Sequence, residues 1–490
     1  MYKIVGGNSH GLADVEEFID LINDPPSELQ DFFDKKTDIF MARAPGRLDV
    51  MGGIADYSGS LVLEMPIAEA TLAAVQKIGE PIIKIVSFSG DTGRTFAFEM
   101  PLLHFANDNP NGGYKPIKDY FSRNRSNHWA SYIVGAFSIL SGELGIDFQN
   151  GARILISSRI PIGKGVSSSA ALEVAAMQAI CSAFDIRVEP RELALLCQKV
   201  ENLIVGAACG VMDQITANCG AENSLVSLLC QPAEILGMLS IPAAVEFWGI
   251  DSGVRHAVAG SDYTSVRIGA FIGYRIIADL ARFQVTWIKD GIVGIRDERW
   301  NGYLVNVSPA EYEKEFASRM PDAISGRDFI DKYAGTTDPV TSVDPARNYA
   351  VKAPAEHAIY ENNRVKLFSD LLQNVKTDEH LDVLGELMFE SHASYAACGL
   401  TETGTDRIVK LVRDSRTKGL FGARITGGGS GGTVAILARR GSSSAVSQIA
   451  RQYQIETGKR PYIFHGSSPG CSISGCMRLS SVADESAING

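Results

Sequence analysis

A short glycine- and serine-rich stretch, residues 161–171, constrains this chain more than any other part of its sequence. An apolar run at 154–156 precedes it and predicts a strand, and apolar residues at helical spacing follow it as far as residue 184. A tight turn between a strand and a helix gathers backbone N–H groups, hydroxyl groups and the positive helix end into an anion site. The residues that would form this site are Gly163, Lys164, Gly165, Ser167, Ser168 and Ser169.

The stretch differs from the phosphate-binding pattern G-x-x-x-x-G-K-[ST], because glycine follows Lys164. A glycine- and serine-rich turn that only caps a helix would have the same composition. Lys164 would contact a triphosphate or point into solvent. Other parts of the sequence must therefore decide between these interpretations.

Charge and cysteine content exclude several classes of protein. The net charge is -11 and no run of lysine and arginine is present, so we expect no nucleic-acid partner. The eight cysteines include no C-x-x-C pair, so we expect reduced thiols and no zinc site. No apolar run is long enough to span a bilayer and no leader pattern is visible, so we expect no membrane partner and a cytoplasmic location.

A second stretch of unusual composition covers residues 42–59 and contains one proline, four glycines and four charged residues. This composition predicts a shaped loop rather than a regular element. Arg47 and Asp56 would face one pocket or form a surface ion pair, which contributes little to stability.

A third stretch covers residues 423–437, and five of the six residues at 427–432 are glycine. A flexible linker has this composition. Strand-like apolar runs flank the glycines closely, however, and a glycine patch fixed between strands lets another segment or a ligand approach the backbone.

Two acidic residues lie between these stretches. A helix predicted over 189–205 carries Glu201 near its end, and Asp213 follows Gly210 in a short apolar segment. A buried acid is costly unless it is paired or serves in chemistry. A carboxylate base and a second carboxylate that binds a metal ion are what a phosphoryl-transfer site needs.

The length of 490 residues predicts at least two domains. We expect an N-terminal extension packed on the surface at 1–38, a first domain at 39–240, and a second domain at 241–490 with an irregular insertion around 284–350.

Strands are expected at 71–75, 82–87, 94–98 and 245–250, a polar loop at 107–114, and helices at 129–144, 361–375 and 381–398. Trp129 would stack on a purine or pack in the core, and His256 is expected to be a hydrogen-bonded loop histidine.

The three stretches, in this order, resemble the GHMP kinase superfamily, which phosphorylates small metabolites with ATP. The resemblance covers roughly residues 40–470. Residues 44–59 resemble the galactokinase signature A-P-G-R-V-N-L-I-G-E-H-T-D-Y-N-G, and residues 209–214 resemble its C-G-I-M-D-Q segment. Within that branch the chain also resembles the kinase portion of the plant L-arabinokinases. The resemblance implies an α+β fold of two domains, an N-terminal one like ribosomal protein S5 domain 2 and a ferredoxin-like C-terminal one, with the active site between them.

The resemblance also implies roles for individual residues. Asp213 would accept the proton of the sugar C1 hydroxyl, and Arg47 would keep it ionised and neutralise the transferred phosphoryl group. The sugar would be bound by Arg47, Gly53, Ile54, Asp56, Gly210, Asp213 and Tyr263. ATP would be bound by Gly163, Lys164, Gly165, Ser167, Ser168, Ser169 and Trp129, and Mg²⁺ by Ser169, with Ser168 as an alternative, and Glu201.

One departure from the galactokinase pattern concerns the sugar. Galactokinases carry Glu-His where this chain has Gly53-Ile54, and that acid is expected to bind the exocyclic hydroxymethyl group of galactose. L-Arabinopyranose has the same ring hydroxyl arrangement but lacks this group. A site built for a hydroxyl rejects an analogue without it by about 10⁴-fold.

We therefore expect a sugar-1-kinase that makes L-arabinose 1-phosphate. Its partners would be the sugar and ATP, and it would be a monomer or homodimer. The alternatives are a galactokinase and a non-catalytic sugar sensor on the same fold. The intact serine run and the presence of Asp213 and Glu201 argue against the sensor.

Overall fold

The computed structural model describes residues 1–89, 94–104, 113–254 and 261–482. His256 and most of the expected polar loop at 107–114 lie outside these residues. In the described part of the chain, nine strands form the sheet of the N-terminal half, in the order β1-β18-β2-β3-β6-β4-β5, and β7 and β8 extend the sheet from β3. These strands are β1 (Tyr2–Gly6), β2 (Ile39–Met51), β3 (Leu61–Ile78), β4 (Ile82–Ser89), β5 (Arg94–Pro101), β6 (Gly151–Ser158), β7 (Ser224–Leu229), β8 (Glu234–Ser240) and β18 (Met477–Ser481).

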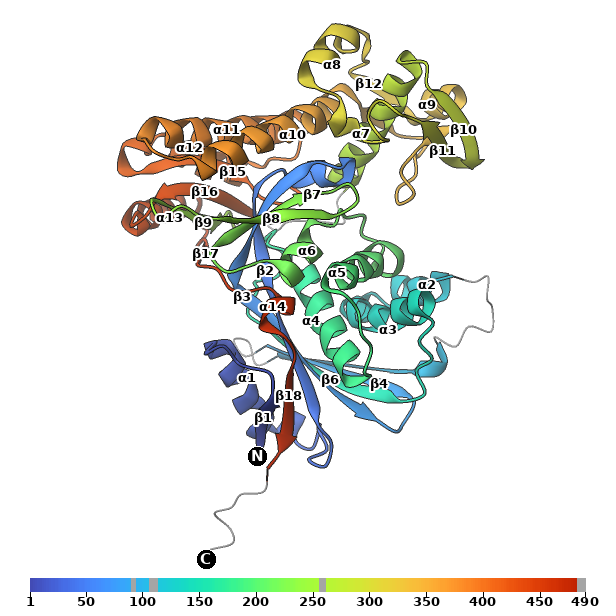
Figure 1. Ribbon diagram of the computed structural model, residues 1–490, viewed down its shortest axis with the longest axis vertical. Helices are drawn as coiled ribbons and strands as arrows, with labels where there is room; N and C mark the ends of the chain where they lie inside the picture. The colour runs from blue at the N-terminus through green and yellow to red at the C-terminus, as the bar shows by residue number, and fades with distance from the viewer. Residues whose placement is uncertain (90–93, 105–112, 255–260, 483–490) are drawn as a thin grey trace, which may run out of the picture.

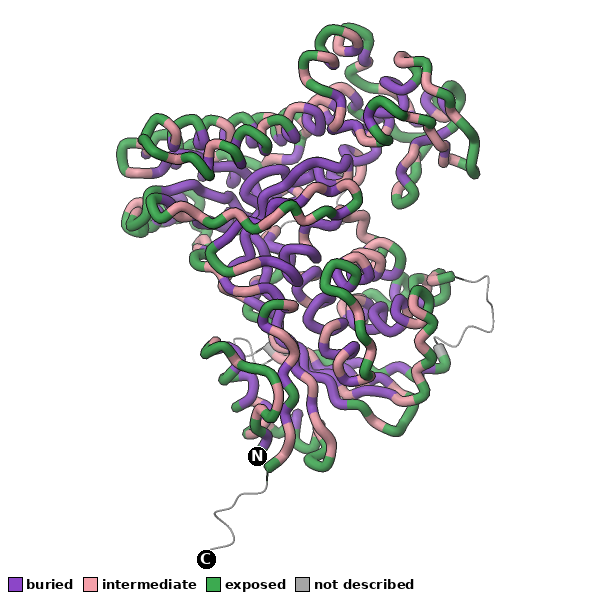
Figure 2. Tube along the Cα trace, in the orientation of Figure 1, coloured by how far each residue is buried: buried purple, intermediate pink, exposed green. Residues whose placement is uncertain are grey.

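Helices cover one face of this sheet (Figure 1). They are α2 (Lys115–Arg123), α3 (Ser131–Leu144), α4 (Ser168–Ala183), α5 (Pro190–Lys199) and α6 (Met212–Cys219). Helix α4 packs on β2 and β3 and is rich in buried alanine, whose small side chains let it approach the sheet closely. Burial follows β2 and β3 through the middle of the molecule (Figure 2).

The second half is built on an antiparallel sheet in the order β15-β16-β9-β17. Its strands are β9 (Val245–Asp251), β15 (Leu420–Ile425), β16 (Thr433–Arg439) and β17 (Ile463–His465). Its helices are α7 (Ser261–Leu280), α10 (Lys352–Gln373), α11 (Asp378–Ala397), α12 (Thr403–Arg413) and α13 (Ser443–Thr457). This strand order, with helices between β9 and β15 and between β16 and β17, confirms the expected ferredoxin-like α+β arrangement. None of the helices in the described residues is both long and apolar enough to cross a membrane.

The insertion at 284–350 is more regular than the sequence predicted. It contains β10 (Gln284–Lys289), β11 (Gly291–Arg296), β12 (Ala323–Ser325), β13 (Gly335–Thr336), β14 (Asn348–Ala350), α8 (Pro309–Glu315) and α9 (Gly326–Tyr333). Buried aromatic residues, among them Trp300, Tyr312 and Phe329, form its core against α7 and α10. Because these residues recur without a fixed period, no amphipathic pattern marked this core in the sequence.

Strands from near both ends of the chain join the main sheet. Residues 1–38 are not only a surface extension, because β1 pairs with β18 and β18 pairs with β2 within the main sheet. The last strand therefore belongs to the N-terminal half, although the second domain was expected to run to residue 490. Helix α1 (Ala13–Asn23) supports this edge, where Asp14 accepts a hydrogen bond from the buried Arg43 at 2.8 Å.

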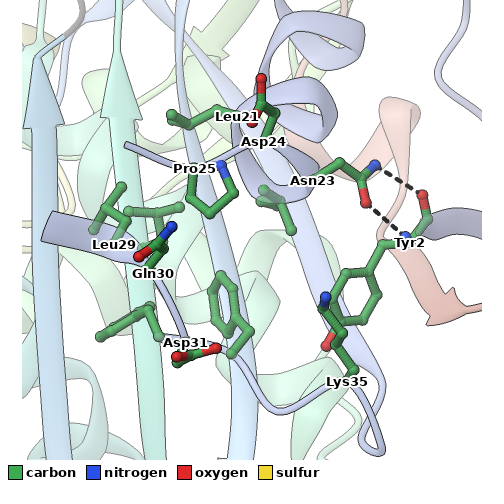
Figure 3. Close-up of a pocket in the computed structure, with 13 residues that line it drawn as sticks. Tyr2, Leu21, Asn23, Asp24, Pro25, Leu29, Gln30, Asp31 and Lys35 are labelled. Carbon is green, nitrogen blue, oxygen red and sulfur yellow. Dashed lines mark hydrogen bonds between the residues drawn. The ribbon is translucent and has the colours of Figure 1, made fainter. Parts of the chain in front are cut away.

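A cavity of about 450 Å³ lies between the end of α1, the segment that follows it and the sheet (Figure 3). The Asn23 side chain holds the entry of β1 beside it: Tyr2 donates its backbone N–H to Asn23 Oδ1 at 2.6 Å, and Asn23 Nδ2 donates to the Tyr2 carbonyl at 3.0 Å. Strands β1 and β18 are thus built into the fold.

The stretch 42–59 is not the loop that its composition predicted. Strand β2 runs as far as Met51, and a 3₁₀ turn, η2 (Gly53–Ser58), follows it. Register shifts between Pro45 and Arg47 and between Asp49 and Met51 show that bulges absorb the proline and glycine within a buried strand. The strand therefore carries polar side chains to the place where the two halves meet. The eight cysteines, all within the described residues, are free thiols as expected.

Candidate active site

A cavity of about 750 Å³ lies where the two halves meet. Its walls come from β2 and η2, from the glycine- and serine-rich turn before α4, from the segment between Glu201 and Asp213, and from the start of α7. Gly428 of the glycine-rich loop between β15 and β16 closes one side. The three stretches that the sequence singled out therefore meet at one cavity.

The turn before α4 opens the start of that helix toward the cavity. Gly163 and Gly165 have φ values of +75° and +73°, which favour glycine, and Ser167 precedes the helix with a φ of +59°. Ser167, Ser168 and Ser169 line the cavity, and none of the described residues hydrogen-bonds the buried Ser167 hydroxyl. Hydroxyl groups and the unpaired N–H groups of the first turn of this long helix suit a phosphate group.

Arg47 and Asp213 form the central pair of the cavity. Arg47 Nε donates to Asp213 Oδ1 at 2.9 Å, and Arg47 Nη1 donates to the Gly165 carbonyl at 2.8 Å. Burial alone would lower the pKa of Arg47, but Asp213, Glu64 and Asp49 outweigh it and raise that pKa above its ordinary value. Arg47 therefore stays cationic. It links the glycine- and serine-rich turn before α4 to the carboxylate of Asp213, as a phosphoryl-transfer site requires.

Glu64, which the sequence did not single out, lies beneath this pair. Its Oε2 is 3.2 Å from Arg47 Nε, and its side chain is fully buried. Burial, and after it the charge of Asp49, holds the pKa of Glu64 well above its ordinary value. Of the two carboxylates beside Arg47, Asp213 is the one that lines the cavity.

Asp56, Gly210 and Tyr263 form the other side of the cavity. A Cβ atom on Gly210 would lie 1.6 Å from Asp56 Oδ2, so only glycine lets this backbone approach the carboxylate. Burial, and after it the charge of Asp213, raises the pKa of Asp56 to about 7. None of the described residues hydrogen-bonds the buried Asp56 Oδ1, so this oxygen has an unused acceptor site at the cavity wall. Tyr263 is buried beside Asp56 and packs edge-on against Tyr57, with ring centroids 5.9 Å apart.

Glu201 and Ser169 lie together at the phosphate side of the cavity. Glu201 is on a single π-helical turn, Val200–Val205, a feature that often marks functional sites. Burial, and after it the charge of Asp213, raises the pKa of Glu201 to about 7, while a hydrogen bond with Ser169 opposes the rise. Gln214 Nε2, which the sequence did not single out, donates to Glu201 Oε2 at 2.8 Å.

This donor set fits Mg²⁺, which binds oxygen and shares its coordination with phosphate and water. Among the described residues, no group of three or more acidic, histidine or cysteine side chains is placed to hold a metal ion by itself. Phosphate oxygens would therefore have to complete the coordination that Ser169 and Glu201 begin.

Three predicted residues do not line the cavity in the described structure. Lys164 turns away and pairs with the buried Asp251 of β9. Trp129 is half-buried and packs against Phe96, with ring centroids 6.2 Å apart. Gly53 does not line the cavity, although its neighbour Ile54 does. The neighbours of Trp129, His128 and Tyr132, line the cavity instead, and helical spacing would have placed these two on one face.

The glycine-rich loop is not a flexible linker. A Cβ atom on Gly427 would lie 2.8 Å from Arg47 Nη2, and one on Gly432 would lie 2.8 Å from the Lys164 carbonyl. Thr433 Oγ1 donates to that same carbonyl at 2.8 Å. The loop therefore lies directly against Arg47 and the turn before α4.

A buried ion pair joins the two halves beside this loop. Arg424 Nη1 of β15 donates to Asp49 Oδ1 of β2 at 2.8 Å, and both side chains are fully buried. The Gly427 N–H donates to Asp49 Oδ2 at 2.9 Å. The walls of the cavity are thus held in a fixed relation.

Family models match three parts of the chain. The N-terminal domain of the GHMP kinases matches residues 131–221, the galactokinase galactose-binding signature matches residues 27–77, and the C-terminal domain of the GHMP kinases matches residues 369–456. These matches follow one another along both halves of the fold and include the serine run and Arg47.

Named relatives agree with these models. The L-arabinokinase of Arabidopsis thaliana is 42% identical over 98% of this chain, which spans 52%, about half, of that relative's length. The galactokinase of Chloroflexus aggregans is 29% identical over 86% of this chain and 89% of its own length. The crystal structure of Lactococcus lactis galactokinase complexed with galactose aligns with a TM-score of 0.67 at 21% identity, over 93% of this chain and 99% of that one.

Proposed function

We propose that this chain is a GHMP kinase that transfers the γ-phosphoryl group of ATP to the anomeric hydroxyl of L-arabinose. The observation that carries the proposal is the position of Asp213. It is paired with Arg47 and lies between the serine run of α4 and the polar wall formed by Asp56 and Tyr263. One carboxylate thus borders a region suited to phosphate and a region suited to sugar hydroxyls.

Each side chain has a part in the proposed reaction. Asp213 accepts the proton of the attacking C1 hydroxyl, and Arg47 stabilises the charge that develops on the transferred phosphoryl group. The serine run and the start of α4 hold the triphosphate. A magnesium ion, when bound by Ser169 and Glu201 together with the phosphates, would neutralise phosphate charge. Because Arg47 spans from Asp213 to Gly165, it fixes the proposed base and the phosphate-binding turn relative to each other.

The proposed sugar follows from the wall beside Asp56. Ile54 lines the cavity and offers no hydrogen-bond partner to a hydroxymethyl group. L-Arabinopyranose lacks that group, so it leaves no hydroxyl without a hydrogen-bond partner beside this apolar side chain. The O6 hydroxyl of D-galactose would be left unpaired there. The relative at 42% identity, whose name is L-arabinokinase, supports the same choice.

A second candidate is a galactokinase. The match to the galactose-binding signature at residues 27–77 favours it, as do galactokinases whose length this chain covers almost completely. A non-catalytic sugar sensor is disfavoured, because the serine run, Asp213 and Glu201 all reach the cavity.

The test is ADP release from purified protein with ATP and Mg²⁺ over free L-arabinose, D-galactose, D-fucose, D-xylose and D-glucose. The proposal predicts the highest kcat/KM for L-arabinose. The highest value for D-galactose would replace it with the galactokinase assignment. Sugar binding without any turnover would support the sensor.

A further inference from the structure

The space next to Gly53 is already filled by another residue. Gly53 has a φ of +48°, and a Cβ atom built there would lie 1.8 Å from the Tyr395 hydroxyl oxygen. It would also lie 2.8 Å from Arg424 Nη2 and 2.9 Å from Asp49 Oδ2. Any side chain at position 53 would therefore overlap the hydroxyl group that α11 of the second half presents here.

The Tyr395 hydroxyl is held at this point by two hydrogen bonds. It accepts the Ile54 backbone N–H at 2.8 Å and donates to the Gly427 carbonyl at 2.8 Å. Tyr395 is fully buried, and its ring lies 5.1 Å from the Arg424 guanidinium carbon. One side chain thus connects η2, on the sugar side of the cavity, with the glycine-rich loop, on the phosphate side.

Ile54, the residue that Tyr395 holds in place, forms an apolar part of the cavity wall. Ile54 packs in a buried cluster with Tyr395, Tyr263, Leu400 and Ile425, and it also lines the cavity. The hydrogen bond from the Ile54 N–H fixes the backbone that carries this side chain. A hydroxymethyl group directed at this corner would meet an immobile apolar surface.

We infer that Tyr395 is a positioning residue that sets the sugar specificity, by occupying the space beside Gly53 and fixing Ile54 against the exocyclic carbon of a hexose. The inference rests on the proposed sugar kinase activity and deepens it. Tyr395 itself does not line the cavity among the described residues, so it acts through Ile54.

Arg424 gives a second, independent reason. None of the described residues hydrogen-bonds its Nε or Nη2 atom, although the side chain is fully buried. A carboxylate at position 53 would find these donors within reach if the Tyr395 hydroxyl were absent. Gly53 and Tyr395 together therefore fill a space in which an acidic side chain would form hydrogen bonds with Arg424.

The test measures kcat/KM for L-arabinose and for D-galactose in four variants: Tyr395→Phe, Tyr395→Leu, Gly53→Glu and the double variant Gly53→Glu/Tyr395→Leu. Tyr395→Phe loses the hydrogen bonds to Ile54 and to Gly427. It should reduce the ratio of the two kcat/KM values, L-arabinose over D-galactose, by about tenfold. Gly53→Glu alone should lose activity on both sugars, because its Cβ overlaps the hydroxyl. The double variant should recover activity and favour D-galactose.

A matched control is Tyr349→Phe, because the Tyr349 hydroxyl is also buried and also accepts a backbone N–H, that of Asp344 at 2.9 Å, within the insertion. It should leave the ratio unchanged. Melting temperature and binding of an ATP analogue establish that each variant is folded, and Tyr395→Phe decides the outcome if the double variant does not fold.

A wild-type ratio retained in folded Tyr395→Phe overturns the inference alone, provided that the wild-type protein prefers L-arabinose. A wild-type protein that prefers D-galactose, or that turns over neither sugar, overturns both the inference and the proposed function.

Discussion

At the scale of single residues, the site depends on how buried charges are divided among a few carboxylates. Glu64 and Asp213 both approach Arg47 Nε, but Glu64 is fully buried and Asp213 reaches the cavity. Burial, and after it the charge of Asp49, holds the pKa of Glu64 well above its ordinary value. Of the two carboxylates beside Arg47, only Asp213 lines the cavity and can meet a bound hydroxyl there.

Asp213→Asn should lower kcat for sugar phosphorylation by about 10³-fold, because asparagine keeps the size and the hydrogen bond to Arg47 but does not act as a base. Binding of the sugar and of an ATP analogue should change by only a few fold. The measurement is ADP release at saturating substrates, with the exposed Asp382→Asn as the control. A kcat within tenfold of the wild-type value would exclude Asp213 as the base.

Asp56 gives the site a dependence on pH. Because burial and Asp213 raise its pKa to about 7, Asp56 is mostly protonated at pH 6 and mostly ionised at pH 8. A sugar hydroxyl donates to the ionised form, so sugar binding should tighten by up to about tenfold from pH 6 to pH 8. Equilibrium binding of the sugar without ATP measures this, and the profile should be flat in Asp56→Asn. Weaker wild-type binding at pH 8 than at pH 6 would contradict the assignment.

At the scale of elements, the decisive one is the glycine-rich loop between β15 and β16, which lies against the turn before α4. Gly432→Ala should raise the KM for ATP by about tenfold or more, because its Cβ would lie 2.8 Å from the Lys164 carbonyl and would push the turn away.

Gly441→Ala is the matched control for this change. Gly441 has a φ of +89°, close to the +82° of Gly432, but a Cβ atom there would meet nothing within 4 Å. Both variants carry the backbone strain of about 1–2 kcal/mol, and only Gly432→Ala adds the contact. Equal effects of the two variants on KM would show that the loop contact is unimportant for ATP.

The helices and strands also show how much of the fold could be predicted from the sequence. Apolar runs and helical spacing predicted β4, β9, α3 and α11 to within a few residues. The stretch 42–51 was predicted as a loop, because composition does not reveal that bulges absorb a proline and a glycine inside a strand. Arg47, Asp213 and Glu201 were found because each lies in or near a motif.

Other parts of the site could not be predicted from the sequence. Arg424 and Tyr395 contact Asp49 and Ile54 across separations of 375 and 341 residues, which no local pattern encodes. Glu64 lies in an apolar strand and looked like an ordinary strand residue. Trp129 was singled out for its ring, but the helix turns the neighbouring His128 and Tyr132 toward the cavity instead.

At the scale of the whole molecule, β1 and β18, which are far apart in the sequence, pair within the main sheet. Asp14→Ala should lower the free energy of unfolding by about 3 kcal/mol, because it leaves Arg43 buried without its ion partner. Because Asp14 does not line the cavity, kcat/KM should stay within twofold of the wild-type value. Urea unfolding measures the first effect, and the exposed Asp20→Ala on the same helix is the control. Lost activity with unchanged stability would instead assign residues 1–38 a part in catalysis.

The central claim is that this fold phosphorylates the anomeric hydroxyl of L-arabinose in preference to that of D-galactose. The most direct measurement is a competition: equal concentrations of the two sugars with limiting ATP and Mg²⁺, with the sugar 1-phosphates quantified by ³¹P nuclear magnetic resonance. The product ratio equals the ratio of kcat/KM values. A product that is mostly L-arabinose 1-phosphate is the predicted result. A product that is mostly D-galactose 1-phosphate, or phosphate at another hydroxyl, would contradict the claim.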